Sequence, residues 1–357
     1  MRDYYQDSKS EKLFQESSKF PKTQPNPHIR DENENRKIMF LVFLALVPAL
    51  LFSGYLFGFT VYRNYLTASA TAVLLEFVWF KFVGRDYQFD FSAIVTAVLL
   101  AMNLPPSAPW YFPIVGTSFA IIVVKEFFGG LGYNFLNPAL GGRALLVGLF
   151  YNQMFLISWP DPPFNKIPPE IVSAATATDT VSGATPLALM RAGEVLTVSE
   201  LGDAFFGFVG GRAGETSAFL LLLGGLFLIY KKIISPRIPF IILGTIGLFA
   251  FILGPSGLFT GSWQNVIGHI ISGGAMLGAF FMATDYASTP STKAGENLFA
   301  LGVGLLVVVF RFFGLTNEGM SYAILIMNCF TPMIDRLLRL RVLGEGKATP
   351  FNLKINS

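Results

Sequence analysis

The sequence predicts an all-α integral membrane protein with about ten transmembrane helices, arranged as two inverted five-helix repeats with broken or re-entrant helices. Of the 357 residues, 52% are hydrophobic and only 14% are charged, and the mean hydropathy is +0.53. Soluble domains carry about 25% charged residues. This deficit, together with 37 Phe and 35 Gly, indicates a chain that crosses a lipid bilayer many times. We expect no nucleic-acid partner.

Ten apolar segments predict the helices, and most of them approach the length needed to cross about 30 Å of hydrocarbon. Two of them, 91–104 and 217–230, are notably short. Short segments interrupted by Gly and Pro are typical of broken or tilted membrane helices. The expected segments are 38–58, 65–83, 91–104, 111–128, 135–157, 217–230, 238–254, 265–283, 297–313 and 319–335.

The distribution of basic residues predicts how these segments are oriented. With the N-terminus in the cytoplasm, most of the 26 Lys and Arg residues fall on the cytoplasmic side, in agreement with the positive-inside rule. We therefore expect a cytoplasmic N-terminal tail at 1–37, a cytoplasmic C-terminal tail at 336–357, and an extracytoplasmic loop at 159–216. The basic residues on the outer side are Arg63, Lys166, Arg191, Arg212 and Arg311.

Five segments precede the long loop and five follow it, so the halves 38–158 and 217–335 would have opposite orientations. Weak internal similarity supports this repeat. The stretch 137–145 resembles 289–297, and each follows a Gly-rich approach between the fourth and fifth segment of its half. Because Gly permits unwound geometry and close backbone approach, we interpret both stretches as re-entrant or broken helices. Tight helix packing at Gly is the alternative interpretation.

The outer loop contains the most specific motif, since residues 179–186 read Asp-Thr-Val-Ser-Gly-Ala-Thr-Pro. A Ser-Gly-Ala-Thr run preceded by Asp resembles the acceptor site of flavin transferases, which attach FMN through its phosphate to the final Thr hydroxyl. Thr185 is then the attachment residue. Gly183 and Ala184 keep the backbone thin for the transferase. Ser182 or Asp179 would contact the transferase, its metal or the phosphate, and Asp179 is expected to act in recognition during attachment. An ordinary polar loop is the alternative, although a long loop among short connections usually has a function.

Ionisable residues within apolar segments are functional candidates by default. Glu126, Arg143 and Asp285 are expected at the cytoplasmic ends of the repeat elements, near Asn137. There these four residues would line a cavity for an ion or a second flavin. Structural ion pairing is the alternative.

Other polar residues are expected to have structural roles. Glu76 would pair within the helix bundle, and Arg311 would reach the membrane boundary by snorkelling. His269 would be a packed, hydrogen-bonded side chain, with proton relay as the alternative. The single Cys329 would be packed among apolar side chains, with a ligand role shared with another subunit as the alternative. One Cys excludes an intrachain disulfide. We expect no metal site in this chain.

Three stretches occur in an order typical of a known family. They read LPPSAPW at 104–110, KEFFGGLGYNFLNPAL at 125–140 and SGATPL at 182–187. They resemble the D subunit of the Rnf ion-translocating ferredoxin:NAD oxidoreductase, and the related B subunit of the sodium-pumping NADH:quinone reductase shares much of the pattern. The resemblance covers roughly residues 26–340. The modest N-terminal tail favours the Rnf D subunit, and the quinone-reductase B subunit stays open.

The resemblance implies a subunit of the prokaryotic plasma membrane that carries FMN on Thr185, loaded by an extracytoplasmic flavin transferase. It also implies a non-covalent riboflavin in some relatives and a fold similar to urea-transporter-like channels. The complex would couple electron flow between ferredoxin and NAD to Na⁺ or H⁺ transport. It would include a second flavinylated subunit and further membrane and peripheral subunits, and the isolated chain would not be catalytic. A urea-transporter-like channel and a structural scaffold are the alternatives from other classes.

Overall fold

The computed structural model describes residues 32–155, 185–209, 211–215, 217–254, 257–314 and 319–338. Helices account for most of them, and the strands β1 (Leu253–Gly254) and β2 (Gly257–Leu258) form a short antiparallel pair. Four described helices are long and apolar enough to cross a membrane, or five if a bent pair counts as one span. The predicted class, a helical multi-pass membrane protein, is therefore confirmed.

The first half of the chain forms helices at all five of its predicted segments. α2 begins at Glu32, inside the predicted tail, because the polar stretch 32–37 continues the same helix. Gly58, with φ of 81°, separates α2 from α3. The elements are α2 (Glu32–Phe57), α3 (Phe59–Val83), α4 (Ser92–Met102), α5 (Tyr111–Ser118), its π-helical continuation η1 (Phe119–Lys125), the 3₁₀ turn η2 (Glu126–Phe128), α6 (Pro138–Leu149) and α7 (Tyr151–Phe155).

The second half begins with two short helices that lie within the predicted outer loop, α9 (Pro186–Arg191) and α10 (Val198–Phe206). A Thr197 and Glu200 capping box starts α10. The predicted segment 265–283 is broken, with a bend of 62° between its two parts. The remaining elements are α11 (Ala218–Tyr230), α12 (Arg237–Ile252), α13 (Trp263–Ile271), α14 (Ala275–Leu277), the π-helix η3 (Gly278–Met282), α15 (Lys293–Phe313) and α16 (Met320–Leu337).

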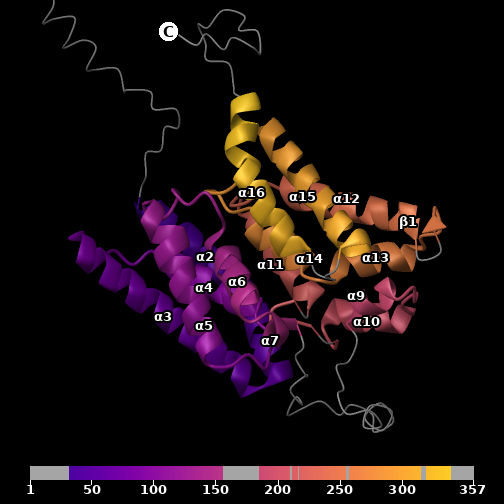
Figure 1. Cartoon of the computed structure of the whole chain (residues 1–357), viewed down its shortest axis with the longest axis horizontal. Helices are drawn as coiled ribbons and strands as arrows, with labels where there is room; N and C mark the ends of the chain where they lie inside the picture. The colour runs from indigo at the N-terminus through magenta and orange to yellow at the C-terminus, as the bar shows by residue number, and fades with distance from the viewer. Residues whose placement is uncertain are drawn as a thin grey trace, which may run out of the picture.

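The helices of the two halves form two neighbouring groups, α2 to α7 and α11 to α16 (Figure 1). Contacts cross the seam where α2 packs against α11 and α6 against α16. A Cβ atom on Gly224 of α11 would lie 2.4 Å from the carbonyl oxygen of Ala45 in α2. Glycine therefore permits a close backbone approach between the halves, as small residues do in membrane helix packing.

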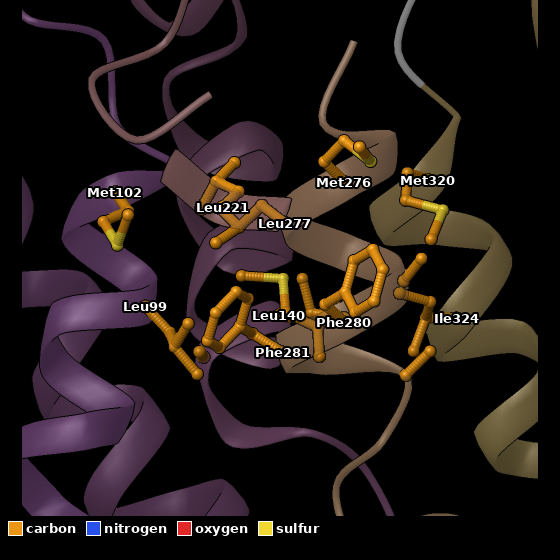
Figure 2. Close-up of a cluster of buried hydrophobic side chains, with 14 of the residues drawn as sticks. Leu99, Met102, Leu140, Leu221, Met276, Leu277, Phe280, Phe281, Met320 and Ile324 are labelled. Atoms are coloured by element: carbon orange, nitrogen blue, oxygen red, sulfur yellow. The ribbon is translucent and has the colours of Figure 1, made fainter. Parts of the chain in front are cut away.

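A cluster of buried apolar side chains fills the seam (Figure 2). Because lipid tails are as apolar as these side chains, the gain comes from close van der Waals packing more than from exclusion of water. The labelled members come from α4, α6, α11, α14, η3 and α16, so both halves contribute. They are Leu99, Met102, Leu140, Leu221, Met276, Leu277, Phe280, Phe281, Met320 and Ile324.

α4 ends within the protein, and the chain after α10 satisfies its last carbonyl groups. The amides of Ala213 and Gly214 donate to the carbonyls of Leu104 and Met102 at 3.1 and 2.8 Å. The buried guanidinium of Arg212 donates to the Asn103 carbonyl at 3.2 Å. A buried helix end needs such partners, and a cation is favourable at its negative pole.

Candidate functional site

Thr185 is the N-cap of α9, with extended backbone angles of −64° and 154°. Its hydroxyl oxygen accepts a hydrogen bond from the Ala188 amide at 3.3 Å, and Pro186 follows at the first helical position. Both are typical features of a helix start. The other predicted motif residues, Asp179, Ser182, Gly183 and Ala184, lie outside the described residues. The structure therefore places only the last residue of the tetrad.

Two glycines of the broken helix α13–α14 leave the space in which α9 packs. A Cβ on Gly268 would lie 2.6 Å from the Met190 sulfur, and one on Gly273 would lie 2.5 Å from Leu187 Cδ2. Gly273 and Gly274 have φ of 65° and 70°, which end α13 in a conformation that favours glycine. The chain that carries Thr185 therefore packs directly on the break in the predicted eighth segment.

Arg311 of α15 satisfies the carbonyl groups at this break. Its guanidinium donates to the carbonyls of His269, Ser272 and Gly273 at 2.5, 2.8 and 3.2 Å. The residue is only 3% exposed. The expectation that Arg311 snorkels to the membrane boundary is therefore wrong, because the interrupted helix provides carbonyl acceptors inside the protein.

Two cavities lie around α9. The smaller one is lined by Thr185 together with Glu215, Ser272 and Gly273. The buried Ser272 hydroxyl has no hydrogen-bond partner among the described residues. The second cavity, of about 160 Å³, lies on the other side of Leu187 and is lined by Arg191, Asn265, His269 and Arg311 among others. Polar side chains thus gather around α9, close to Thr185.

A third cavity lies at the seam between the halves, near the start of α2. It contains two of the four predicted cavity residues, Asn137 and Asp285. The Asn137 amide donates to the Met282 carbonyl at 3.1 Å, and the Asn134 amide lies 3.5 Å from the Asp285 carboxylate. The volume of this cavity is about 80 Å³. Withdrawal from water raises the pKa of Asp285, and hydrogen bonds from Ala287, Ser288 and Asn134 oppose this rise.

The structure does not bring Glu126 and Arg143 to this cavity. Arg143 donates to the Asn103 side chain at 2.9 Å and to the Ser321 hydroxyl of α16, so it links the halves deeper in the protein. Glu126 lies 3.8 Å from the ammonium of Lys125. Of the four residues, the cavity therefore contains Asn137 and Asp285 only.

Lys125 is the centre of a buried ion-pair network. Its ammonium lies 2.5 Å from the Glu76 carboxylate and 2.6 Å from the Ser92 hydroxyl. Ser92 in turn donates to Asp90 at 2.6 Å. The expected pairing of Glu76 is confirmed.

Sequence reasoning missed several buried polar residues around these sites. Three of them lie in helix connections, namely Asn103, Asn134 and Arg212. The fourth, Ser321 of α16, accepts a hydrogen bond from Arg143 across the seam. An available signal was a lone polar residue within an apolar run, such as Asn103 after Met102. Cys329 is exposed on α16, so the expectation that it is packed is wrong.

The fold and the sites together define a polytopic helical membrane protein with a helix interrupted between α13 and α14 and a threonine cap packed on that interruption. The chain matches the NQR2, RnfD, RnfE family over residues 22–344, and it belongs to that family.

Named relatives agree with this assignment. The chain is 46% identical to the D subunit of the Na⁺-translocating ferredoxin:NAD⁺ oxidoreductase complex of Acetobacterium woodii, over 90% of this chain and 95% of that protein. It is 38% identical to the D subunit of the proton-translocating ferredoxin:NAD⁺ oxidoreductase complex of Clostridium ljungdahlii, over 87% and 92%. It is also 38% identical to the D subunit of the ion-translocating oxidoreductase complex of Pseudomonas aeruginosa, over 90% and 96%.

Proposed function

We propose that this chain is the D subunit of an ion-translocating ferredoxin:NAD⁺ oxidoreductase complex and that it carries FMN in phosphoester linkage to Thr185. The assignment to this complex rests on the near full-length similarity to proteins of that name. The observation that carries the flavin assignment is the position of Thr185. It is the final Thr of the acceptor-like tetrad, and it caps a helix beside two cavities.

Two features around Thr185 fit a phosphoester of FMN, whereas the Glu215 carboxylate in the same cavity requires a cation or a proton beside the phosphate. The Thr185 residue is not fully buried. Its side-chain oxygen accepts a hydrogen bond from the Ala188 amide, and an esterified oxygen can still accept one. The buried Ser272 hydroxyl, which has no partner in the described part of the chain, lines the adjoining cavity and would donate to a phosphate oxygen. FMN would supply reversible electron transfer, and the protein would anchor and orient it.

The proposal includes the predicted topology of ten membrane crossings in two inverted repeats. Cytoplasmic termini and an extracytoplasmic Thr185 follow from the positive-inside distribution. A buried arginine bonds the carbonyl groups at the end of α4 and at the break between α13 and α14, which supports a related construction of the two halves. The membrane would be a prokaryotic plasma membrane, and a flavin transferase would act on its outer side.

The seam cavity at Asn137 and Asp285 is the proposed place for an ion or for a non-covalent riboflavin. Its volume of about 80 Å³ has room for an ion with a few waters, and a riboflavin would require the cavity to widen. Its walls are apolar with a few polar groups. The named relatives are described as translocating either Na⁺ or protons, so similarity alone gives no preference for the coupling ion. The partners would be the other subunits of the complex, including a second flavinylated subunit.

The flavin assignment predicts a covalent fluorescent adduct. The full chain would be co-expressed with a flavin transferase, denatured, and separated on a gel under ultraviolet light. The wild-type band should fluoresce and Thr185→Val should be dark, because valine keeps the shape and removes the hydroxyl. Thr180→Val, five residues away in the same motif region, is the matched control and should stay fluorescent. A fluorescent Thr185→Val band would refute the site, and a dark wild-type band would refute covalent loading.

A further inference from the structure

The cavity between α9, α13 and α15 has an unusual set of lining side chains for the interior of a membrane protein. Arg191, Arg311, His269 and Asn265 all line it, and none of the described residues that line it is acidic. Three of them, Arg311, His269 and Asn265, are at least nine-tenths buried. Its volume of about 160 Å³ has room for several waters or for one edge of a larger ligand.

His269 is the residue in this cavity that most needs a ligand. It is 5% exposed, and its Nδ1 atom has no hydrogen-bond partner among the described residues. Its ring stacks on Phe312 with centroids 5.0 Å apart, and Arg311 holds its backbone carbonyl. Buried polar atoms are nearly always hydrogen-bonded in folded proteins, since an unpaired one costs about 1–3 kcal/mol. His269 lines the cavity, and its buried Nδ1 atom needs a hydrogen-bond partner that the described residues do not supply.

Thr185 lies within reach of this cavity. Leu187 lines both this cavity and the smaller one that contains Thr185. The two ends of α9 are Thr185, its cap, and Arg191, whose guanidinium bonds the Gly314 carbonyl. The helix has six residues and is about 9 Å long. The ribityl chain of FMN spans a comparable distance, so a phosphate held at Thr185 allows the ring to reach the cavity.

We propose that this cavity receives the pyrimidine edge of the flavin attached to Thr185. His269 hydrogen-bonds that edge, and Arg191 and Arg311 place positive charge beside it. This inference rests on the proposed function. The pyrimidine edge carries the carbonyl oxygens and ring nitrogens of the flavin, and it gains negative charge on reduction. Two guanidinium groups and a histidine match that chemistry, and they stabilise the reduced flavin relative to the oxidised one. The arrangement thus raises the reduction potential of the flavin attached to Thr185.

The test uses the full chain co-expressed with a flavin transferase and purified in detergent, with the Thr185→Val spectrum subtracted. The variants are His269→Leu, which removes the ring nitrogens, and Arg191→Gln, which removes a charge at an exposed position. Gln264→Leu, on the same helix but outside the cavity, is the matched control. Each variant is measured for gel fluorescence, for flavin fluorescence anisotropy, and for midpoint potential.

Gel fluorescence is expected to be unchanged in Arg191→Gln while its midpoint potential falls. A tenfold change in the ratio of reduced to oxidised flavin corresponds to about 30 mV for a two-electron couple. His269→Leu should lower the anisotropy of the flavin, and Arg191→Lys should restore the potential. If loaded His269→Leu and Arg191→Gln both match wild type and Gln264→Leu in potential and anisotropy, the cavity assignment is refuted while covalent loading stands. A dark wild-type band refutes both proposals.

Discussion

Asp285 shows how the surroundings of a single residue set its chemistry. Its carboxylate accepts from the Ser288 hydroxyl at 3.1 Å and faces the Asn134 amide at 3.5 Å. It also lines the seam cavity, whose walls are mostly apolar. Removal of a carboxyl from water disfavours its charged form, and here this effect on the pKa exceeds that of the opposing hydrogen bonds. The residue therefore holds its proton at a higher pH than an ordinary aspartate.

This shift predicts a protonated carboxyl above the usual Asp pKa of about 3.9. Infrared difference spectra of wild type minus Asp285→Asn should show a protonated carboxyl band that persists above that pH. Since the pKa is raised in the folded state, stability should decrease as pH rises from the unfolded to the folded pKa, and Asp285→Asn should lack this decrease. A wild-type band that disappears at the ordinary pKa would contradict the prediction.

The partners of polar residues buried between helices could not be predicted from the sequence. Glu76 and Lys125 are 49 positions apart, yet they form an ion pair of 2.5 Å. The sequence shows that each must find a partner, because an unpaired charge in hydrocarbon is costly. The choice of partner depends on how α3 and η1 pack, and no local pattern encodes it.

Helix interruptions are the features of individual elements that place the candidate site. Broken helices were expected at 137–145 and 289–297, but α6 and α15 begin there at the caps Asn137 and Thr292. The bend of 62° lies at Gly273 and Gly274 instead, inside the predicted segment 265–283. The contact with α9 was not predicted, since the loop that contains α9 has few of its own periodic signals. Gly273 allows both the helix break and the contact with α9, because it adopts a positive φ and leaves space for Leu187.

Gly273→Ala is therefore expected to destabilise the protein and to displace α9. A left-handed conformation costs a non-glycine residue about 1–2 kcal/mol, and the new methyl group would also collide with Leu187. Thermal unfolding of the purified chain and flavin loading at Thr185 would be measured. Gly84→Ala at the end of α3 is the control, because Gly84 has φ of 72° but no described atoms within 4 Å of its Cβ position. Equal effects of the two substitutions would mean that the collision with α9 has no consequence.

The whole molecule depends on the seam between its halves. The apolar cluster of Figure 2, the Arg143 bonds to Asn103 and Ser321, and the α2–α11 contact all cross it. The candidate riboflavin or ion cavity lies in the same seam. Packing at the seam should therefore control both stability and the shape of this cavity.

Gly224→Val tests the seam. The valine Cβ would lie 2.4 Å from the backbone carbonyl oxygen of Ala45, an atom that cannot move without shifting α2. Overpacking of this kind typically costs about 1–3 kcal/mol, so the melting temperature in detergent should fall clearly. Gly244→Val places the same side chain on α12 where no neighbour lies within 4 Å, and it should have little effect. Matching melting temperatures for the two variants would show that the close α2–α11 approach contributes nothing.

The break at residue 273 appeared only in the structure. The sequence alone predicted the membrane class, the positions of the apolar segments and Thr185 as the candidate anchor. These depend on composition, charge bias and short motifs, which are local properties of the chain. Only the tertiary structure decided which residues meet: Arg311 at the end of α13, Arg143 at the seam rather than in the cavity, and His269 in a cavity beside α9. The physical reason is that interhelical packing brings together residues far apart in sequence. Buried polar groups then bond to whatever that packing places within reach.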